Sequence, residues 1–410
     1  MPGQPVVNIG MVGHVDHGKT TLTQALSGVW TDTHSEERKR GISIKLGYAD
    51  TAFYRTPDGR FYARGKHPDD KEDSSQELLR VVSFVDAPGH ETLMAVMISG
   101  ASIMDGAMLL ISATEKCPQP QTREHLAALQ IAGIENIVVV QNKIDIVSRE
   151  RAVESHAEIR SFLEGTIAEG APIIPVSAHH DVNLDVLIQA IEDIIPTPDR
   201  SSSQPGLMYV ARSFDVNRPG SRPDKLQGGI IGGSIVEGSF SVGDSILIAP
   251  GRRVQSGGRS TWEPIRTTIE SVKGGGIGLK SVHAGGLCGI ATPMDPVSTK
   301  ADELSGQVMA REGELPPVWE SLDLDLQLLE KMVSTDEDDA GEIRPLQPNE
   351  MLMVNSATAT SVGTVSSIKG TSATLQLRLP ICAKRGSRIT LSRRIGSRWR
   401  LIGHGSIAGR

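Results

Sequence analysis

Residues 13–20, which read Gly-His-Val-Asp-His-Gly-Lys-Thr, have the types and spacing that bind phosphate groups. An apolar run precedes them and a helical pattern follows, so glycine can curl the backbone and aim several amides inward at a helix N-terminus. Lys19 can reach the β- and γ-phosphates, and the Thr20 hydroxyl can bind Mg²⁺. The nucleotide contacts expected from this loop are Val15, Asp16, His17, Gly18, Lys19, Thr20 and Thr21.

Residues 86–90, Asp-Ala-Pro-Gly-His, follow an apolar run that ends at Val85. Asp86 is suited to hold Mg²⁺ through water, and Gly89 can bring its N–H close to a γ-phosphate. A lone Asp-x-x-Gly is weak evidence, but the phosphate-binding loop makes it strong.

Residues 142–145, Asn-Lys-Ile-Asp, follow the next long apolar run. The Asp145 carboxylate can accept two hydrogen bonds from guanine, and adenine offers neither donor. Charge-assisted bonds of about 1.5–3 kcal/mol each give a roughly hundred- to ten-thousand-fold preference. Lys143 can lie along the base and Asn142 can tie loops together. A further run, Ser177, Ala178 and His179, is expected to offer a backbone N–H to the base.

Residues 40–44, Arg-Gly-Ile-Ser-Ile, lie between the phosphate-binding loop and Asp86. A hydroxyl here can bind Mg²⁺ only when a γ-phosphate is present, so loss of that phosphate would release the loop. Without this context the stretch would be an ordinary edge strand.

Short apolar runs alternate with helical patterns through the first half of the chain, as in a doubly wound, mostly parallel α/β sheet. The motifs stand at strand ends, where such folds bind ligands. Residues 53–62 depart from the alternation and predict a hairpin around Pro57-Asp58-Gly59. After a linker at residues 196–205, strand-like runs between Gly- and Pro-rich turns predict two antiparallel β-barrels. The predicted domains are residues 1–200, 201–312 and 313–410.

Composition predicts a cytoplasmic protein. No run is long and apolar enough to cross a membrane, and no secretory signal is visible. The three cysteines are far apart, which indicates neither a disulfide framework nor a zinc site. The net charge of −7 still allows local basic patches that could bind nucleic acid.

Together these motifs resemble the translational GTPases. The chain is most similar to the family of gamma subunits of archaeal translation initiation factor 2, through residues 34–37, 45–49 and 118–125 and through stretches of the second half. The resemblance implies a GTP-hydrolysing domain followed by two barrels. It also implies GTP-dependent delivery of initiator methionyl-tRNA to the small ribosomal subunit, with alpha and beta partner subunits and a separate GTPase-activating factor.

The same resemblance assigns roles to residues. Thr20 and Ser43 are implied ligands of one Mg²⁺, with Asp86 acting through water, and Asp16 and Gly41 contribute to a second Mg²⁺ site. His90 is implied to orient the attacking water, beside an apolar gate of Val15 and Ile42. The candidate tRNA contacts are Tyr48, Gly228, Gly229, Gly232, Gly233, Lys384 and Arg385. The last two begin a carboxyl-terminal basic stretch, which contains no acid and continues with Arg388, Arg393, Arg394, Arg398 and Arg400.

Two departures from the family stand out. Ser43 replaces the usual threonine, which keeps the hydroxyl and loses the methyl group. Many relatives carry a four-cysteine zinc knuckle, but residues 53–80 contain no cysteine, so we expect no zinc.

Two other readings remain open. Another tRNA-delivering GTPase, such as a selenocysteine-specific elongation factor, would share the three-domain start, although such factors usually carry a further carboxyl-terminal domain for which this chain is too short. A GTP-gated subunit of a metabolic enzyme, as in sulfate activation, would bind no RNA.

Overall fold

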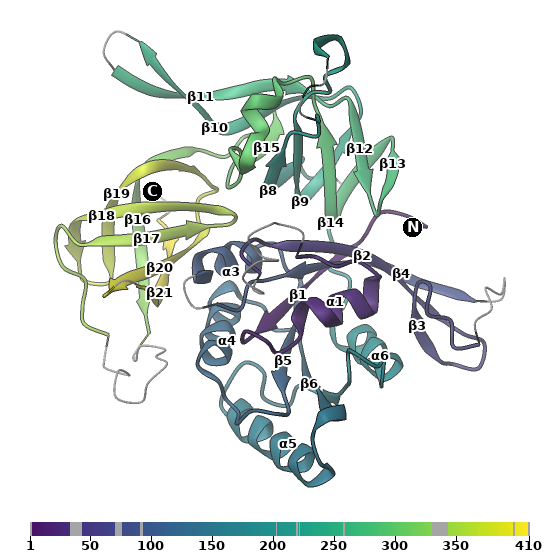
Figure 1. Ribbon diagram of the computed structural model, residues 1–410. Coiled ribbons are helices and arrows are strands. Elements are labelled where there is room, and N and C mark those ends of the chain that lie inside the picture. The colour runs from purple at the N-terminus through teal and green to yellow at the C-terminus, as the bar shows by residue number, and fades with distance from the viewer. Residues whose placement is uncertain are drawn as a thin grey trace. The chain divides into compact units, whose positions relative to one another are not determined.

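The computed structural model describes residues 2–32, 43–69, 76–90, 93–201, 203–218, 220, 222–256, 259–329, 343–396 and 398–408. The chain forms two compact units (Figure 1). The first holds a mainly parallel sheet covered by helices, and the second holds two antiparallel β-structures. Among the described residues, no helix is long and apolar enough to cross a membrane.

The first unit is built on a seven-stranded sheet in the order β3-β2-β4-β1-β5-β6-β7. Its central strands pair in parallel, whereas β2 runs antiparallel to β4 and forms the predicted hairpin with β3. The strands are β1 (Val7–Gly13), β2 (Gly47–Arg55), β3 (Phe61–Ala63), β4 (Glu77–Asp86), β5 (Gly106–Ser112), β6 (Ile137–Asn142) and β7 (Ile173–Pro175).

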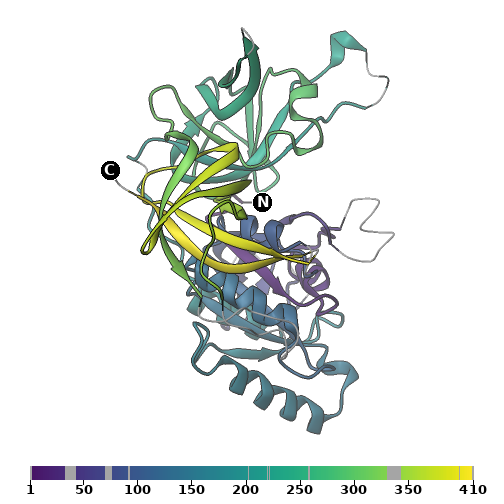
Figure 2. The same ribbon diagram turned by 90° about the vertical axis from the view of Figure 1, so that its left-hand side faces the viewer.

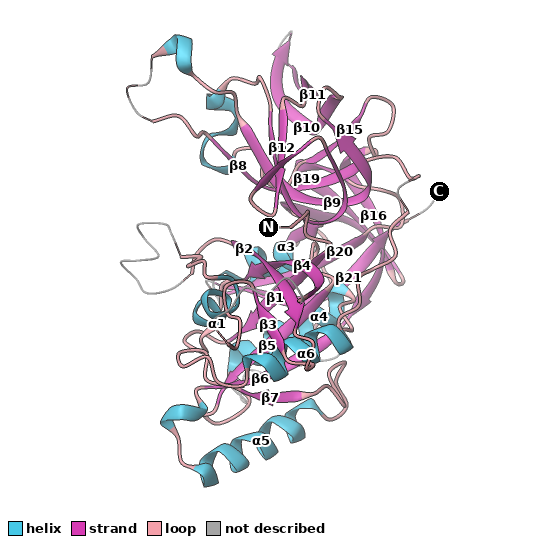
Figure 3. Ribbon diagram, turned by 90° about the vertical axis from the view of Figure 1, so that its right-hand side faces the viewer, coloured by secondary structure: helices cyan, strands magenta, loops and turns pink. Residues whose placement is uncertain are grey.

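Helices cover both faces of this sheet, as Figure 3 shows in cyan and magenta. The helices are α1 (Lys19–Ser27), α3 (Met94–Ala101), α4 (Pro120–Ala132), α5 (Arg149–Leu163) and α6 (Leu184–Ile194). Side chains of α1 and α6 share one core with Ile9, Phe84 and Met108. Successive side chains of a strand point to opposite faces of the sheet, so Asn8 lies on the face opposite to Ile9. There its side chain donates to the Ile103 carbonyl, which follows α3. The strands are therefore buried on both sides, which explains their continuous apolar runs.

The second unit begins with an eight-stranded antiparallel sheet in the order β11-β10-β15-β8-β9-β14-β12-β13. Its strands are β8 (Leu207–Phe214), β9 (Ile230–Ser241), β10 (Ser245–Ser256), β11 (Arg259–Thr268), β12 (Ser271–Gly274), β13 (Ile277–Leu279), β14 (Ser281–Ala291) and β15 (Val308–Arg311). Inward side chains, among them Phe240 and Met309, fill its core.

The same unit ends in a closed six-stranded barrel, whose strands are green to yellow in Figure 2. They are β16 (Val318–Leu328), β17 (Met351–Ser356), β18 (Ala359–Lys369), β19 (Ser372–Cys382), β20 (Arg388–Ile395) and β21 (Arg398–Ile407). Leu322, Leu375 and Ile389 lie in its core. The predicted fold class, an α/β domain followed by two antiparallel β-barrels, is confirmed in its layout. Strands β16–β21 close into a barrel, whereas strands β8–β15 pair as an eight-stranded antiparallel sheet with β11 and β13 at its two ends.

Candidate functional site

The loop from Gly13 to Lys19 joins β1 to α1 and takes backbone conformations that need glycine. Gly13 has φ +141° and lies against the carbonyl of Leu110, while Gly18 has φ +89° and lies against the Asn142 side chain. A Cβ atom at either position would clash, so glycine is required for the close approach as well as for φ.

Lys19 folds back over this loop. Its Nζ donates to the carbonyl oxygens of Gly13 at 2.9 Å and His14 at 2.7 Å. Burial lowers the pKa of Lys19 to about 8, although neighbouring acids oppose the shift. Gly89, from the loop after β4, lies directly against Lys19 and the backbone of Val15, so the two glycine-bearing loops meet. Asp16, with φ +61°, is exposed at the loop's surface.

Hydroxyl and carboxyl groups gather at the first residues of α1. Thr20 Oγ1 donates to Asp86 Oδ2 at 2.8 Å and lies 3.4 Å from Ser43 Oγ. The structure adds two residues that the motifs do not contain: Thr31 donates to the same Asp86 oxygen at 2.5 Å, and an Asp32 carboxylate oxygen lies 3.4 Å from Thr20 Oγ1.

Asp86 is 1% exposed, and its second oxygen, Oδ1, is buried with no hydrogen-bond partner among the described residues. Burial raises the pKa of Asp86 to about 6, because it penalises the carboxylate more than the bonds from Thr31 and Thr20 and the charge of Lys19 stabilise it. Such an orphaned oxygen beside two hydroxyls is what a hydrated cation would satisfy.

The expected guanine-binding residues also come together. Asn142, at the end of β6, donates to the His17 carbonyl at 2.9 Å and accepts from the Ala178 N–H at 3.1 Å, so it ties two loops. A hydrogen bond from Ser177 lowers the pKa of Asp145, which keeps this carboxylate ionised at neutral pH.

Lys143, with φ +63°, stands between Asn142 and the short helical turn that carries Asp145. His180, which the motifs did not single out, lies with Nε2 3.7 Å from Asp145 and touches the exposed ring of His179 edge-on.

His90 lies four residues beyond Asp86, at the end of the loop that follows β4, and is half-buried. Thr21 lies in the first turn of α1. Gly41 and Ile42 fall outside the described residues, so the second Mg²⁺ site and one side of the expected gate stay predictions.

The candidate tRNA contacts are spread over both units. Tyr48 is a half-buried residue of β2 that pairs with Val85. Gly228, Gly229 and Gly233 each stand where a Cβ would clash with Thr292, Thr299 or Tyr209, whereas a Cβ on Gly232 would make only ordinary contacts. Close packing alone therefore explains why glycine stands at three of these four positions.

The carboxyl-terminal basic stretch is partly neutralised in the structure. Lys384 forms an ion pair with Glu237, and the Arg385 guanidinium lies 5.6 Å from the centre of the Trp319 ring. Arg393 is 4% exposed and pairs with Glu350, so it is not available to a phosphate group. The sequence shows no acid within the stretch, but the fold brings acids from elsewhere in the chain to two of its residues.

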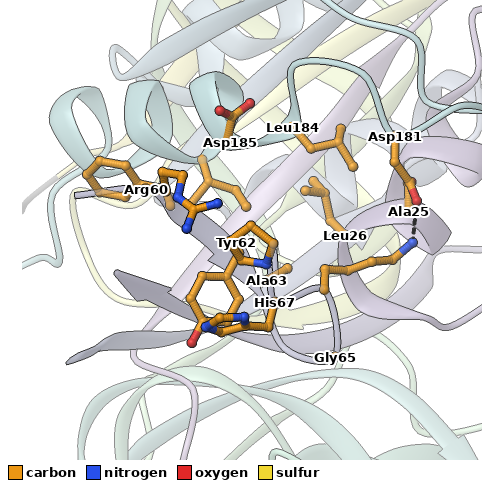
Figure 4. A pocket seen from close by; sticks show the side chains of 14 residues that line it. Ala25, Leu26, Arg60, Tyr62, Ala63, Gly65, His67, Asp181, Leu184 and Asp185 are labelled. Atoms are coloured by element: carbon orange, nitrogen blue, oxygen red, sulfur yellow. Dashed lines mark hydrogen bonds and ion pairs between the residues drawn. The ribbon is translucent and has the colours of Figure 1, made fainter. Parts of the chain in front are cut away.

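A separate cavity of about 340 Å³ lies between α1, α6 and the loop after β3 (Figure 4). Leu26, Leu184 and other apolar side chains line it, and an ion pair between Lys66 and Asp181 stands at its edge. It shares no lining residue with the phosphate-binding loop.

The described residues contain no group of three or more His, Cys, Asp or Glu side chains placed to hold a metal ion. The three cysteines are buried and form no disulfide, and burial raises the pKa values of Cys117 and Cys382 to about 12. The absence of zinc stays a prediction.

Comparison with known proteins matches both units. Residues 4–197 match the family model of the elongation factor Tu GTP binding domain, and residues 320–407 match that of initiation factor eIF2 gamma, C terminal. Translation initiation factor 2 subunit gamma of Methanothermobacter thermautotrophicus is 54% identical over 409 residues, which cover 99% of this chain and 100% of the relative. The same subunit of Methanocaldococcus jannaschii is 53% identical over 407 residues, 99% of this chain and 98% of the relative.

Two solved structures share the fold at lower identity. A bacterial selenocysteine-specific elongation factor superposes with a TM-score of 0.74 at 23% identity; the match covers 99% of this chain but only 58% of the other. The elongation factor SelB from Methanococcus maripaludis, solved in complex with a GTP analogue, has a TM-score of 0.70 at 21% identity and covers 100% of this chain and 80% of the other.

Proposed function

Because the chain belongs to the family of translation initiation factor 2 gamma subunits, GTP-binding GTP hydrolases of protein synthesis, we propose that it carries initiator methionyl-tRNA to the small ribosomal subunit in its GTP-bound state. GTP hydrolysis triggers release of the tRNA. The alpha and beta subunits of the same factor and a separate GTPase-activating factor are its partners, and the cycle runs in the cytoplasm.

One observation carries this proposal. Identity of 53–54% extends over 98–100% of the relatives' length, through both antiparallel structures as well as the GTPase unit. A chain that shared only the GTPase chemistry would be expected to match over the first unit alone. The second unit is therefore expected to keep the family's task of carrying a tRNA.

The nucleotide is proposed to lie along the loops that Asn142 ties together. Amides of the phosphate-binding loop and the Lys19 ammonium would hold the phosphates, and Asp145 would accept from the two guanine donors. The support is geometric: Asn142 bonds to both the His17 carbonyl and the Ala178 N–H, so the phosphate end and the base end of the site are held in register.

The residues present fit Mg²⁺. Thr20, Ser43 and, through water, Asp86 would hold it, and the orphaned Oδ1 of Asp86 is the observation that supports this. Mg²⁺ usually keeps several waters and takes one or two carboxylates plus phosphate oxygens, so a cluster of three acids is not required. When bound, the ion neutralises phosphate charge that develops during hydrolysis.

Hydrolysis is proposed to depend on His90, which would orient the attacking water. Its place just after Gly89 supports this, because Gly89 lies against Lys19 and Val15 at the phosphate end of the site. Without an activating partner the rate should be slow, on the order of 10⁻⁴ to 10⁻² s⁻¹, as in other GTPases that act unaided.

The switch is proposed to act through the segment from Ser43 to Tyr48. Ser43 lies beside Thr20 in the candidate Mg²⁺ site, and Tyr48, five residues on, is a candidate contact for the aminoacylated tRNA end. A nucleotide that orders this segment would therefore also order part of the tRNA-binding surface.

Equilibrium binding of charged initiator tRNA and charged elongator tRNA tests the carrier role. The measurement uses the chain assembled with its alpha and beta partners, GTP and fixed salt. We expect the initiator tRNA to bind more tightly. Equal affinities would contradict initiator delivery, and no RNA binding at all would favour a metabolic GTP-gated subunit.

A further inference from the structure

Helix α4 reaches the phosphate-binding loop through one buried side chain. His125 Nδ1 lies 2.9 Å from the backbone N of Gly13, a residue 112 positions earlier in the chain. We propose that His125 is a positioning residue, which fixes the start of the phosphate-binding loop by accepting a hydrogen bond from the Gly13 N–H. This inference rests on the nucleotide site proposed above.

Gly13 needs such an acceptor because its backbone leaves the regular pattern of a strand. It has φ +141° and lies against the Leu110 carbonyl, where the loop turns away from β1. Its N–H is buried, and His125 is 0% exposed, so water is not at hand to replace the imidazole. A buried backbone donor without an acceptor is rarely tolerated in folded proteins.

The imidazole is held in the form that accepts. Since Nδ1 accepts a hydrogen bond from the Gly13 N–H, the neutral ring carries its own hydrogen on Nε2. Burial lowers the pKa of His125 to about 3, and the charge of Lys19 and the neighbouring His14 and His17 act in the same direction. The ring therefore stays neutral at physiological pH.

Other groups fix the rest of the loop. The His17 ring bonds to the Leu110 carbonyl at 2.9 Å, Asn142 bonds to the His17 carbonyl, and Lys19 bonds to the Gly13 carbonyl. His125 adds the anchor at the first residue. With the loop held at its start, middle and end, its inner amides are preorganised for phosphate groups, which reduces the cost of ordering on binding.

Two substitutions separate this role from simple packing. In His125→Asn, Oδ1 is the same number of bonds from the backbone as Nδ1 and can accept from Gly13. In His125→Leu, an apolar side chain fills the space without an acceptor. Thr122→Val is the matched control, since Thr122 lies on the same helix, is equally buried, and its Oγ1 has no hydrogen-bond partner among the described residues.

The experiment measures GDP and GTP affinity, GTP turnover at saturating GTP, and thermal unfolding of the full chain. His125→Leu should weaken GDP and GTP equally, by roughly 5- to 150-fold, because the relaxed loop must be reordered around an orphaned donor. Turnover at saturating GTP should change little, His125→Asn should restore most of the affinity, and Thr122→Val should leave it unchanged.

Equal loss of affinity in the Asn and Leu variants would overturn the proposal, as would a Leu variant that unfolds at lower temperature yet binds both nucleotides normally. Nitrogen NMR of the unsubstituted protein shows which ring nitrogen of His125 carries the hydrogen, and it does not depend on whether the variants fold. A hydrogen on Nδ1 would also overturn the proposal. If the unsubstituted chain bound neither nucleotide, the nucleotide site itself would fail, which is a distinguishable result.

Discussion

Asp86 and Lys19 show that burial can outweigh attraction between opposite charges. Each is close enough to the other to favour the charged forms, yet burial raises the pKa of Asp86 to about 6 and lowers that of Lys19 to about 8. The site therefore holds these two charged groups at a desolvation cost. A metal ion and phosphate groups would offset that cost by restoring partners to both.

This predicts a pH dependence of Mg²⁺ binding. Below about pH 6 the free site is increasingly protonated at Asp86, so its Mg²⁺ affinity should fall by about tenfold per pH unit, and above pH 6 it should be constant. The measurement is the Mg²⁺ concentration that half-maximally slows GDP dissociation between pH 5 and 8. Asp86→Asn should bind Mg²⁺ more weakly and lack this component, and the nucleotide's own titration cancels in the comparison. Parallel profiles for the two proteins would contradict the assignment.

Asp145 is predicted to select the base. Asp145→Asn should weaken GTP binding by roughly a hundredfold or more, the loss expected for two charge-assisted hydrogen bonds, and should favour xanthine nucleotides. Asp181→Asn is the control, because Asp181 lies in the next loop and pairs with Lys66 instead. Unchanged GTP affinity in Asp145→Asn would remove the guanine-binding assignment.

His90 is predicted to act on hydrolysis alone. His90→Ala should lower partner-stimulated GTP turnover by about a hundredfold, the lower range for a group that handles the attacking water, and leave GTP affinity nearly intact. Single-turnover hydrolysis and equilibrium GTP binding measure the two effects separately. Lost affinity with normal turnover would make His90 a binding residue.

At the scale of elements, a largely buried ion pair joins the sheet to α6. Arg80 of β4 bonds to Glu192 at 2.8 Å and to the Ile191 carbonyl, and its side chain is 9% exposed. Arg55 and Glu77 form a similar pair at 2.7 Å, but both side chains are about half exposed. The two pairs have the same chemistry and differ in burial.

Arg80→Ala should therefore lower the free energy of local opening of α6 by about 1–3 kcal/mol, since the largely buried Glu192 carboxylate is left without its donor. Arg55→Ala, the control, should cost less than about 1 kcal/mol because water screens that pair. Hydrogen exchange of the α6 amides measures both. Equal effects of the two substitutions would contradict the role of burial.

Sequence patterns were most informative where chemistry depends on adjacent residues. Strand ends, the glycines of the phosphate-binding loop and the hairpin at Pro57-Asp58-Gly59 follow from local spacing and backbone preference. Thr31 and His125 could not be found this way, because each meets its partner across 55 or 112 residues and neither belongs to a phosphate, metal or base motif. Their roles depend on tertiary packing, which no local pattern encodes.

Burial adds information that residue type alone does not carry. Arg393 counts as a basic surface residue in the sequence but is buried against Glu350. Gly228 and Gly233 have close backbone neighbours that exclude a side chain, and their contact with tRNA stays a prediction. The sequence alone does not distinguish a glycine that contacts a ligand from one that close packing requires; the structure does.

At the scale of the whole molecule, the chain has a net charge of −7, so any RNA contact must come from a local surface. Arg388 and Arg394 of β20 are exposed and remain candidates for phosphate contacts. Such contacts would make part of the RNA-binding affinity depend on salt, equally in all nucleotide states. The division at residues 1–200, 201–312 and 313–410 stays a prediction.

In the proposed cycle, the bound nucleotide controls tRNA binding. A ligand shifts an equilibrium only by its different affinities for the two states, so GTP should tighten charged initiator tRNA binding relative to GDP. By linkage, the charged tRNA should tighten GTP binding, relative to GDP, by the same factor.

A thermodynamic cycle at fixed salt tests this most directly, with charged initiator tRNA, both nucleotides and the assembly of the chain with its alpha and beta partners. The four affinities should close the cycle, with GTP favouring tRNA by roughly 5- to 150-fold, the usual range of coupling between sites. Equal tRNA affinity in the GTP and GDP states would contradict the switch-coupled carrier, even if RNA binding itself were strong.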